Sequence, residues 1–278
     1  MKNHFTFVKI CSYLILSIGI IIVIFPMYLT IVTSFKTTAE SAENFFSWPN
    51  SLFLGNYVDV INSNNFLVYF SNSVFVTVFS VFLIILYIPA FSFVISRSLK
   101  KQHYYRFLFY FITIGIFVPF QILMIPVIRI MSSISLMNHS GLSLLYMSYA
   151  QIQGVFICTN YMMTIPTDLD ESAYIDGCSI FRVIYSIIFP LAKPIVATLG
   201  IINILWIWND FLLPLLVLNR SKSLWTLPLF QYNFKTTYSF DFNIAFAAFM
   251  LSIVPIMLVY LFAQKYIING LTGGSVKQ

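Results

Sequence analysis

The stretch SNSVFVTVFSVFLIILYIPAFSFVIS, residues 71–96, contains no Asp, Glu, Lys or Arg. A helix needs about 20 apolar residues to cross the hydrocarbon core of a bilayer, so this run is long enough. Because backbone groups in lipid must hydrogen-bond within the protein, such a run predicts a transmembrane α-helix. Further runs are also free of these charges, apart from Asp210 in the last of them; they cover residues 10–35, 107–128, 130–167, 242–264 and 194–218.

Trimming the polar ends of these runs predicts six transmembrane helices. A transmembrane β-barrel would instead require segments of about ten residues in which polar and apolar side chains alternate, and the sequence has none. The six predicted helices lie near residues 10–33, 67–95, 107–128, 143–165, 194–218 and 242–264.

The composition also indicates that lipid is the solvent. Of the 278 residues, 59% are hydrophobic and only 9% are charged, which leaves too little polar surface for a water-soluble protein. The net charge of +6 comes from dispersed Lys and Arg, so it indicates basic span ends rather than a nucleic-acid site. The fold class is therefore expected to be all-α, a polytopic membrane protein with six transmembrane helices.

The Lys and Arg residues are divided unequally between the two sides of the membrane. With a cytoplasmic N-terminus, ten of the fifteen fall in inside segments and five in outside segments. Because cytoplasmic loops carry the basic excess, we expect a multi-pass protein of the cell membrane with both termini in the cytoplasm. The loop between helices four and five is then cytoplasmic.

That loop is acidic, since residues 168–176 hold four of the nine acids in the chain. Thr167 and Asp170 have the spacing of a capping box, and Asp168 and Asp170 complement the positive end of a helix dipole. Helix chemistry alone thus gives these two Asp residues a capping and solubilising role. Gly177 can adopt a left-handed conformation that stops the helix.

A second helix is expected directly after the Gly turn. Ser179 can cap it, and its apolar residues form a broad face that would lie against the membrane. Pro190 is expected to end it. The loop therefore predicts a short helix, a turn and a second amphipathic helix.

The residues of this loop also follow a known spacing. Glu171-Ser-Ala-x-x-x-Gly177, followed after nine residues by Ile187-x-Phe189-Pro190, resembles the EAA motif, E-A-A-x3-G-x9-I-x-L-P. That motif marks the membrane subunits of binding-protein-dependent ABC importers. Ser172 and Phe189 depart from it, but Ser is nearly as small as Ala and Phe keeps an apolar side chain at the Leu position.

The rest of the chain resembles one branch of that family, the MalG-like permeases of carbohydrate importers. The similarity covers nearly the whole sequence. It is carried by Pro26, Ser34-Phe35-Lys36, Trp48-Pro49, Leu54, Asn56-Tyr57, Pro119, Gln121, Pro126, Asp176-Gly177, Trp208-Asn209-Asp210-Phe211, Pro214 and Gly270-Leu271-Thr272-x-Gly274-x-Val276-Lys277.

The resemblance implies roles for particular residues. In this family the acidic loop docks in a cleft of the cytoplasmic ATPase, so Glu171 is expected to make that contact, Ala173 to allow close packing and Gly177 to form the turn. Asp176 and Pro190 complete the expected ATPase-coupling set. The similarity of the tail implies that Gly274, Val276 and Lys277 reach the ATPase dimer.

The resemblance also implies a domain plan and a set of partners. Residues 1–278 would form one importer transmembrane domain, with the first span at 10–33, an EAA-type core at 66–265, the coupling loop at 166–193 and the tail at 266–278. The partners would be a second homologous permease, a cytoplasmic ABC ATPase dimer, an extracytoplasmic sugar-binding protein, the sugar itself and the lipid bilayer. This chain would hold no cofactor, because the ATPase binds the ATP.

Two residues within the fifth predicted span, Asn209 and Asp210, are candidates for the solute pathway. An ionisable residue within a span is a functional candidate, but an Asp beside tryptophans near the interface can equally anchor the helix. No catalytic or metal-binding pattern is present: the three Cys and three His are scattered, and neither HExxH nor a P-loop occurs. The alternatives are the same role for glycerol-3-phosphate or another polyol-type solute, a six-span channel, or an intramembrane enzyme.

Overall fold

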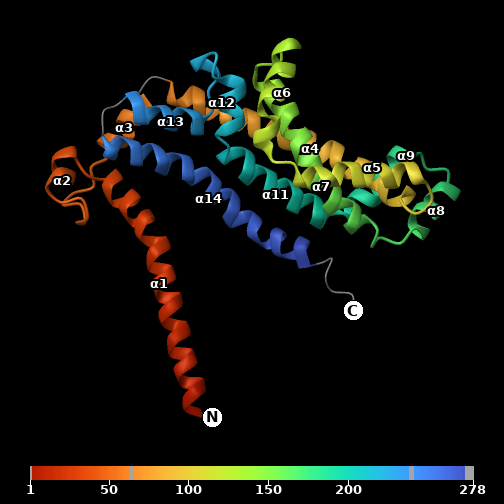
Figure 1. Cartoon of the computed structure of the whole chain (residues 1–278), viewed down its shortest axis with the longest axis horizontal. Helices are drawn as coiled ribbons and strands as arrows, with labels where there is room; N and C mark the ends of the chain where they lie inside the picture. The colour runs from red at the N-terminus through yellow and green to blue at the C-terminus, as the bar shows by residue number, and fades with distance from the viewer. Residues whose placement is uncertain (1, 63–64, 238–240, 273–278) are drawn as a thin grey trace. The chain divides into compact units, whose positions relative to one another are not determined.

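The computed structural model describes residues 2–62, 65–237 and 241–272, and within these ranges the regular elements are helices without any strand (Figure 1). The all-α prediction is confirmed. The α-helices are α1 (Lys2–Ser34), α2 (Thr38–Glu43), α3 (Gly55–Asn62), α4 (Phe66–Ser98), α5 (His103–Ile114), α6 (Phe120–Ser133), α7 (His139–Met162), α8 (Asp168–Ile175), α9 (Ile180–Arg182), α10 (Phe189–Leu191), α11 (Lys193–Asn209), α12 (Leu212–Leu218), α13 (Leu227–Thr237) and α14 (Phe242–Thr272). Short η1 (Gly115–Phe117) and η3 (Lys222–Leu224) are 3-10 helices, and η2 (Val183–Ile188) is a π-helix.

Among the described residues, four helices have the length and hydropathy needed to cross a membrane: 12–34, 66–98, 139–162 and 242–264. Two bent helix pairs raise the number to six if each pair forms one span: 103–117 with 120–133, and 180–191 with 193–209. Four of the predicted spans therefore correspond to continuous helices, the third corresponds to the first bent pair, and the fifth overlaps the second bent pair over residues 194–209.

The third predicted span, 107–128, is not one helix. The segments on either side of Val118–Pro119 are inclined to each other by 109°. Pro119 has no backbone N–H to donate, and its φ of −63° with ψ of 132° takes the chain out of the helical region. The bend follows from this proline, because the residue before a proline also disfavours the helical conformation.

The fifth predicted span, 194–218, is also interrupted. Helix α11 ends at Asn209, and Asp210 is extended, with ψ of 130°, before α12 begins at Leu212. The break is at Asp210 rather than at Pro214, which lies in the first turn of α12. A proline is tolerated there because the first N–H groups of a helix have no partner within it.

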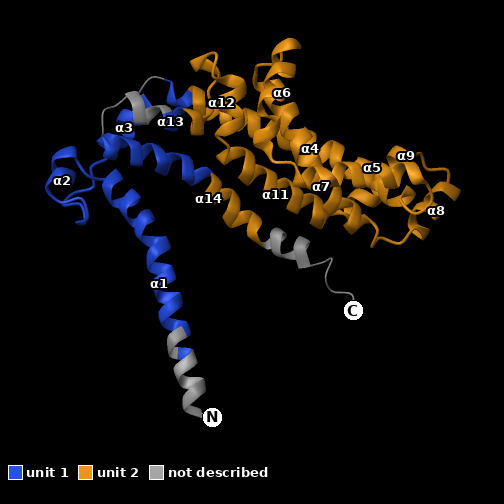
Figure 2. Ribbon diagram, in the orientation of Figure 1, with its two compact units in different colours: residues 1–67, 230–255 blue, residues 68–229, 256–278 orange. Residues whose placement is uncertain are grey.

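The chain forms two compact units, coloured separately in Figure 2: residues 1–67 with 230–255, and residues 68–229 with 256–278. In unit 1, the end of α1 is organised around Lys36, whose side chain is fully buried. Its ammonium donates to the carbonyl of Asn44 at 2.9 Å and to the hydroxyl of Ser47 at 3.1 Å. The carbonyl of Lys36 in turn accepts from the amides of Asn56 and Asn243, each at 2.8 Å.

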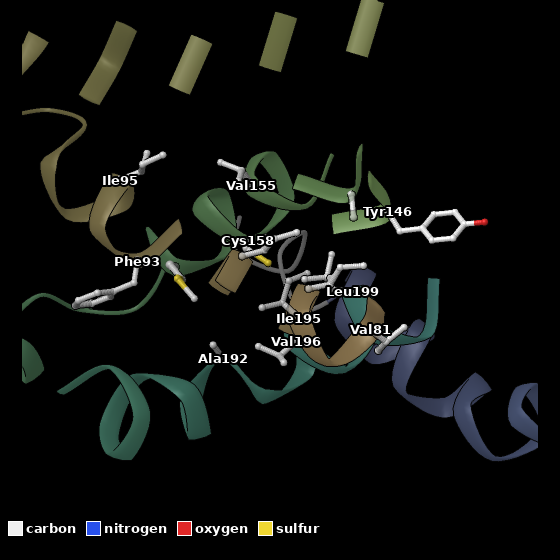
Figure 3. Packing of buried hydrophobic residues seen from close by; sticks show 14 of the residues in the cluster. Val81, Phe93, Ile95, Tyr146, Val155, Cys158, Ala192, Ile195, Val196 and Leu199 are labelled. Atoms are coloured by element: carbon white, nitrogen blue, oxygen red, sulfur yellow. The ribbon is translucent and has the colours of Figure 1, made fainter. Parts of the chain in front are cut away.

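Unit 2 has a hydrophobic core built from α4, α7 and α11 (Figure 3). Val81 and Phe93 of α4, Val155 of α7 and Leu199 of α11 are among its buried side chains. Within this unit α8 and α9 lie at one end and α12 at the other (Figure 1). The core therefore links the acidic loop to the break at Asp210 through packed helices.

Candidate functional site

The acidic loop begins with α8, but its start differs from the prediction. Thr167 has helical angles, φ −70° and ψ −24°, and its hydroxyl makes no capping hydrogen bond. The first turn is formed by backbone bonds instead, from the amides of Asp170 and Glu171 to the carbonyl of Thr167. The predicted capping box is wrong because the carboxylate of Asp170 has another partner.

That partner is Arg97, near the C-terminal end of α4. Nε of Arg97 lies 2.5 Å from Oδ2 of Asp170, and Nη2 lies 3.4 Å from Oδ1. Asp170 is only 4% exposed, so it does not solubilise the loop as helix chemistry alone predicted. A charge this deeply buried requires a paired charge, and Arg97 supplies it.

The same guanidinium also contacts the end of α7. Its Nη1 donates to the carbonyl of Met162 at 3.0 Å and to that of Ile165 at 3.1 Å. The last carbonyls of a helix have no partner within the helix and carry partial negative charge, so a cation is favoured there. The Arg97 guanidinium also lies 5.4 Å from the ring centroid of Phe93.

The turn at Gly177 is confirmed. Gly177 has a φ of +76°, and a residue with a side chain would be strained in this region. The amide of Cys178 donates to the carbonyl of Ala173 at 2.9 Å, and that of Gly177 to the carbonyl of Tyr174 at 3.0 Å. These two bonds form a Schellman motif, which ends α8.

The second helix of the loop is longer than predicted. Ser179 caps it as expected, its hydroxyl accepting from the amide of Arg182 at 3.4 Å, but helical structure continues past Pro190 to Leu191. The π-helical segment η2 ends at Ile188, and Phe189 separates it from this proline. Its wider hydrogen-bond spacing accommodates a residue that cannot donate, and the chain bends by 81° only after Leu191.

The loop residues divide into a buried set and an exposed set. Ala173 is 5% exposed and belongs to the core cluster together with Val183 and Ile188 of η2. The predicted coupling residues Glu171, Asp176, Gly177 and Pro190 are exposed. Large apolar side chains stand among them, with Ile175 85% and Phe181 70% exposed. The outer surface of the loop therefore combines exposed apolar side chains with the carboxylates of Asp168, Glu171 and Asp176.

A hollow of about 400 Å³ adjoins this surface, between α8 and the end of α4. Glu171 and Tyr174 line it from one side, and Lys100 and Lys101 from the other. Burial raises the pKa of the Tyr174 phenol, the Asp170 carboxylate adds to the rise, and Arg97 opposes it. Charges of both signs thus surround this partly apolar hollow.

The structure places the two pathway candidates at the break after α11. The amide of Asn209 donates to the carbonyl of Leu205 at 2.8 Å. The carboxylate of Asp210 accepts from the hydroxyl of Tyr146 at 2.9 Å and from the amide of Leu212 at 3.0 Å. Asp210 therefore stabilises the start of α12, a role that the sequence did not predict.

A second hollow in unit 2 was missed at the sequence level. It measures about 640 Å³ and lies between η1, α7 and α11. Tyr149, Gln153, Asn203 and Trp206 are among its lining residues, and the hydroxyl of Tyr149 has no hydrogen-bond partner. Gln153 is a polar residue in the middle of an apolar run, and this is the sequence signal that could have indicated a face directed away from lipid.

The tail residues Gly274, Val276 and Lys277 lie outside the described residues. Their expected contact with an ATPase is therefore a prediction only. Within the described residues, no group of three His, Cys, Asp or Glu side chains could hold a metal ion.

The chain can now be compared with known proteins. Residues 92–273 match the family described as the inner membrane component of binding-protein-dependent transport systems. The chain is 42% identical over 96% of its length to the multiple sugar-binding transport system permease protein MsmG of Streptococcus mutans, covering 96% of that protein. It is 35% identical to the probable starch degradation products transport system permease protein AmyC of Thermoanaerobacterium thermosulfurigenes, over 98% of this chain and 99% of that one.

A solved structure has the same fold. It belongs to a bacterial ABC transporter involved in the import of the acidic polysaccharide alginate, and the TM-score is 0.82 over 93% of this chain and 95% of that one. The sequence identity is 20%, so this likeness concerns the fold alone.

The helical fold and these matches define a multi-pass membrane permease. The chain belongs to the family of inner membrane components of binding-protein-dependent transport systems, and the resemblance inferred from the EAA spacing is confirmed.

Proposed function

We propose that this protein is the permease subunit of an ATP-driven importer of sugars or oligosaccharides and forms half of the translocation pore. The observation that carries the proposal is the 42% identity, over nearly the full length of both chains, to a permease named for a multiple sugar-binding transport system. Relatives named for starch degradation products and arabinooligosaccharides favour the same solute class. Residues 1–278 would serve as one transmembrane domain.

The acidic loop would couple the permease to its ATPase. Glu171 is exposed at the edge of an apolar surface, an arrangement that fixes the register of a partner carrying a cation or hydrogen-bond donor. Ala173, Gly177 and their bonded turn would keep α8 rigid, so that movement of the ATPase turns the loop as a unit. Asp176 and Pro190 belong to the same exposed surface.

Partners and membrane orientation follow from this role. A second homologous permease would complete the pore, an extracytoplasmic sugar-binding protein would deliver the solute, and an ABC ATPase dimer would bind the ATP and contact the tail at Gly274, Val276 and Lys277. Both termini would lie in the cytoplasm of a cell whose plasma or inner membrane holds the chain. This subunit would carry out no covalent chemistry and would need no cofactor of its own.

The solute pathway is assigned to the face of α7 and α11 that carries the larger hollow. A polar amide such as Gln153 is unfavourable against lipid, so this face suits a water-filled path or the companion permease. Asn209 and Asp210 are weaker candidates because their side chains are already hydrogen-bonded within the subunit.

Reconstitution of the complete complex in liposomes would test the function. We expect uptake of a labelled oligosaccharide that requires ATP and the binding protein. Uptake of glycerol-3-phosphate but of no sugar would assign the polyol-type alternative. Solute flux without ATP would instead indicate a channel and would contradict the proposal.

A further inference from the structure

One guanidinium in unit 2 joins α4 to α7 and α8, which lie far from it in sequence. Arg97 projects from the end of α4, forms an ion pair with Asp170 of α8, and donates to the carbonyl of Met162, the last residue of α7, and to that of Ile165 in the link to α8. Among the described residues this is the one ion pair within 4 Å. We name the set formed by Arg97, Asp170 and these two carbonyls the clasp.

The clasp is mostly shielded from solvent, more on the side of Asp170 than on that of Arg97. The Arg97 side chain is 15% exposed and that of Asp170 6%. Exposed ion pairs contribute little because water and salt screen them, whereas a buried pair that loses one partner leaves an uncompensated charge. The planar guanidinium can hold a carboxylate and two carbonyls at once, which a lysine ammonium does with less defined geometry.

The clasp also lies directly behind the exposed surface of the loop. Asp170 is adjacent in sequence to Glu171, so one residue of α8 faces inward to Arg97 while the next faces outward. The other contacts of α8 with the core are apolar, through Ala173 against η2. Apolar packing is not directional, so the ion pair supplies the directional link between α8 and α4.

We propose that Arg97 is a positioning residue for energy coupling: through Asp170 it fixes α8 to the ends of α4 and α7, so that a force on the loop moves these two spanning helices. The inference rests on the proposed function, since it requires that the loop receives the force. Arg97 is not part of the EAA spacing. The inference gives it a role in coupling and no role in the contact with the ATPase.

The first test uses Asp170→Asn in the reconstituted complex. Asn keeps the size of the side chain and leaves the bonds of Arg97 to Met162 and Ile165 in place, but it removes the charge that holds α8. We expect solute transported per ATP hydrolysed to fall roughly tenfold, within the range of coupling changes seen along linked elements. The same ratio should fall less in Arg97→Lys. In Arg106→Lys, which changes an exposed cation in the same α4–α5 region, it should match the wild type.

A covalent replacement separates positioning from folding. In a background without the native cysteines, the double variant Arg97→Cys/Asp170→Cys should assemble with the ATPase but transport little per ATP. A short bifunctional thiol reagent should then restore coupling, because it again ties α8 to α4. The single variants should not respond to the reagent.

Two outcomes would overturn the inference. The first is a ratio of solute transported to ATP hydrolysed in Asp170→Asn that equals the wild type. The second is a double variant that fails to assemble or stays uncoupled after cross-linking, since the clasp would then serve folding alone. Failure of the proposed function looks different, because the wild-type complex itself would then show no ATP-dependent uptake.

Discussion

The hydroxyl of Tyr146 in α7 donates a 2.9 Å hydrogen bond to the carboxylate of Asp210, at the junction between α11 and α12. Tyr146 is fully buried, and Figure 3 shows its hydroxyl directed away from the core cluster. The other carboxylate oxygen of Asp210 accepts from the amide of Leu212. One side chain therefore accepts a bond from the first turn of α12 and ties the junction to α7.

Replacing Tyr146 by Phe should lower the stability of the purified subunit. The change leaves a carboxylate oxygen of Asp210 without its partner, which costs about 1–3 kcal/mol in a buried site. Asp210→Asn should cost less, because the amide oxygen can still accept from the backbone amide of Leu212 and the amide nitrogen can donate to the hydroxyl of Tyr146. Thermal unfolding in detergent would check this order. If Asp210→Asn is the more damaging of the two, the charge itself has a further role, such as contact with solute.

Lys36→Met should destabilise unit 1. The fully buried ammonium of Lys36 donates to the carbonyl of Asn44 and to the hydroxyl of Ser47, and its removal breaks both bonds, each worth about 1.5–3 kcal/mol for a charged donor. Membrane insertion should survive, because the variant removes a basic residue from the predicted outer side. Lys101→Met, at an exposed position, is the matched control. Equal protease resistance of the two variants in detergent would refute the role of Lys36.

Glu171→Lys should weaken binding of the ATPase while leaving the membrane fold unchanged. Glu171 is exposed, so the reversed charge changes only the surface offered to a partner, and like charges across an interface cost several kcal/mol. Co-purification of the ATPase and sugar uptake would both fall. Asp168→Asn is the control, since it removes only a charge at a helix start, which is typically worth 0.3–1 kcal/mol. If the two variants bind and transport equally, Glu171 does not contact the ATPase.

Gly177→Val tests the rigidity of the turn. A Cβ at Gly177 would meet no atom within 4 Å, so the expected damage comes only from the backbone at φ +76°. For a β-branched residue that strain is on the order of 1–2 kcal/mol. Uptake should fall with Val but not with Asn, which tolerates the left-handed region. Equal uptake by the Val and Asn variants would mean that the Schellman turn is not needed for coupling.

The sequence predicted the helical class and the Gly177 turn, because each depends on local features: run length, hydropathy and the conformational freedom of glycine. It did not predict the clasp. Arg97 and Asp170 are 73 positions apart, and no local pattern distinguishes a carboxylate that caps its own helix from one that binds a distant arginine. The capping prediction at Thr167 was wrong for this reason.

The two breaks within predicted spans differ in how far a local signal reveals them. Pro119 bends the chain through its own geometry, which the sequence reveals. The break after α11 instead depends on the carboxylate of Asp210, which is held by Tyr146 of another helix. Pro214, the local signal for a break in that span, lies where a helix tolerates proline.

The membrane orientation gives the last prediction, which rests on the division of basic residues, ten inside and five outside. In a background without native cysteines, Ser51→Cys should react with a membrane-impermeant maleimide on intact cells. Gln102→Cys should react only after the cells are permeabilised. Both positions are exposed in the structure, whereas the neighbouring Asn56 is buried and would give a false negative.

Asp176→Cys supplies a second inside position, in the acidic loop itself. It should follow Gln102→Cys, because an ATPase in the cytoplasm can reach the loop only from that side. The basic excess makes this arrangement favourable, since Lys and Arg flanking a span are retained on the cytoplasmic side. Labelling of Gln102→Cys or Asp176→Cys on intact cells would show that the orientation is the reverse of the predicted one. The loop could then not be the site where the ATPase binds.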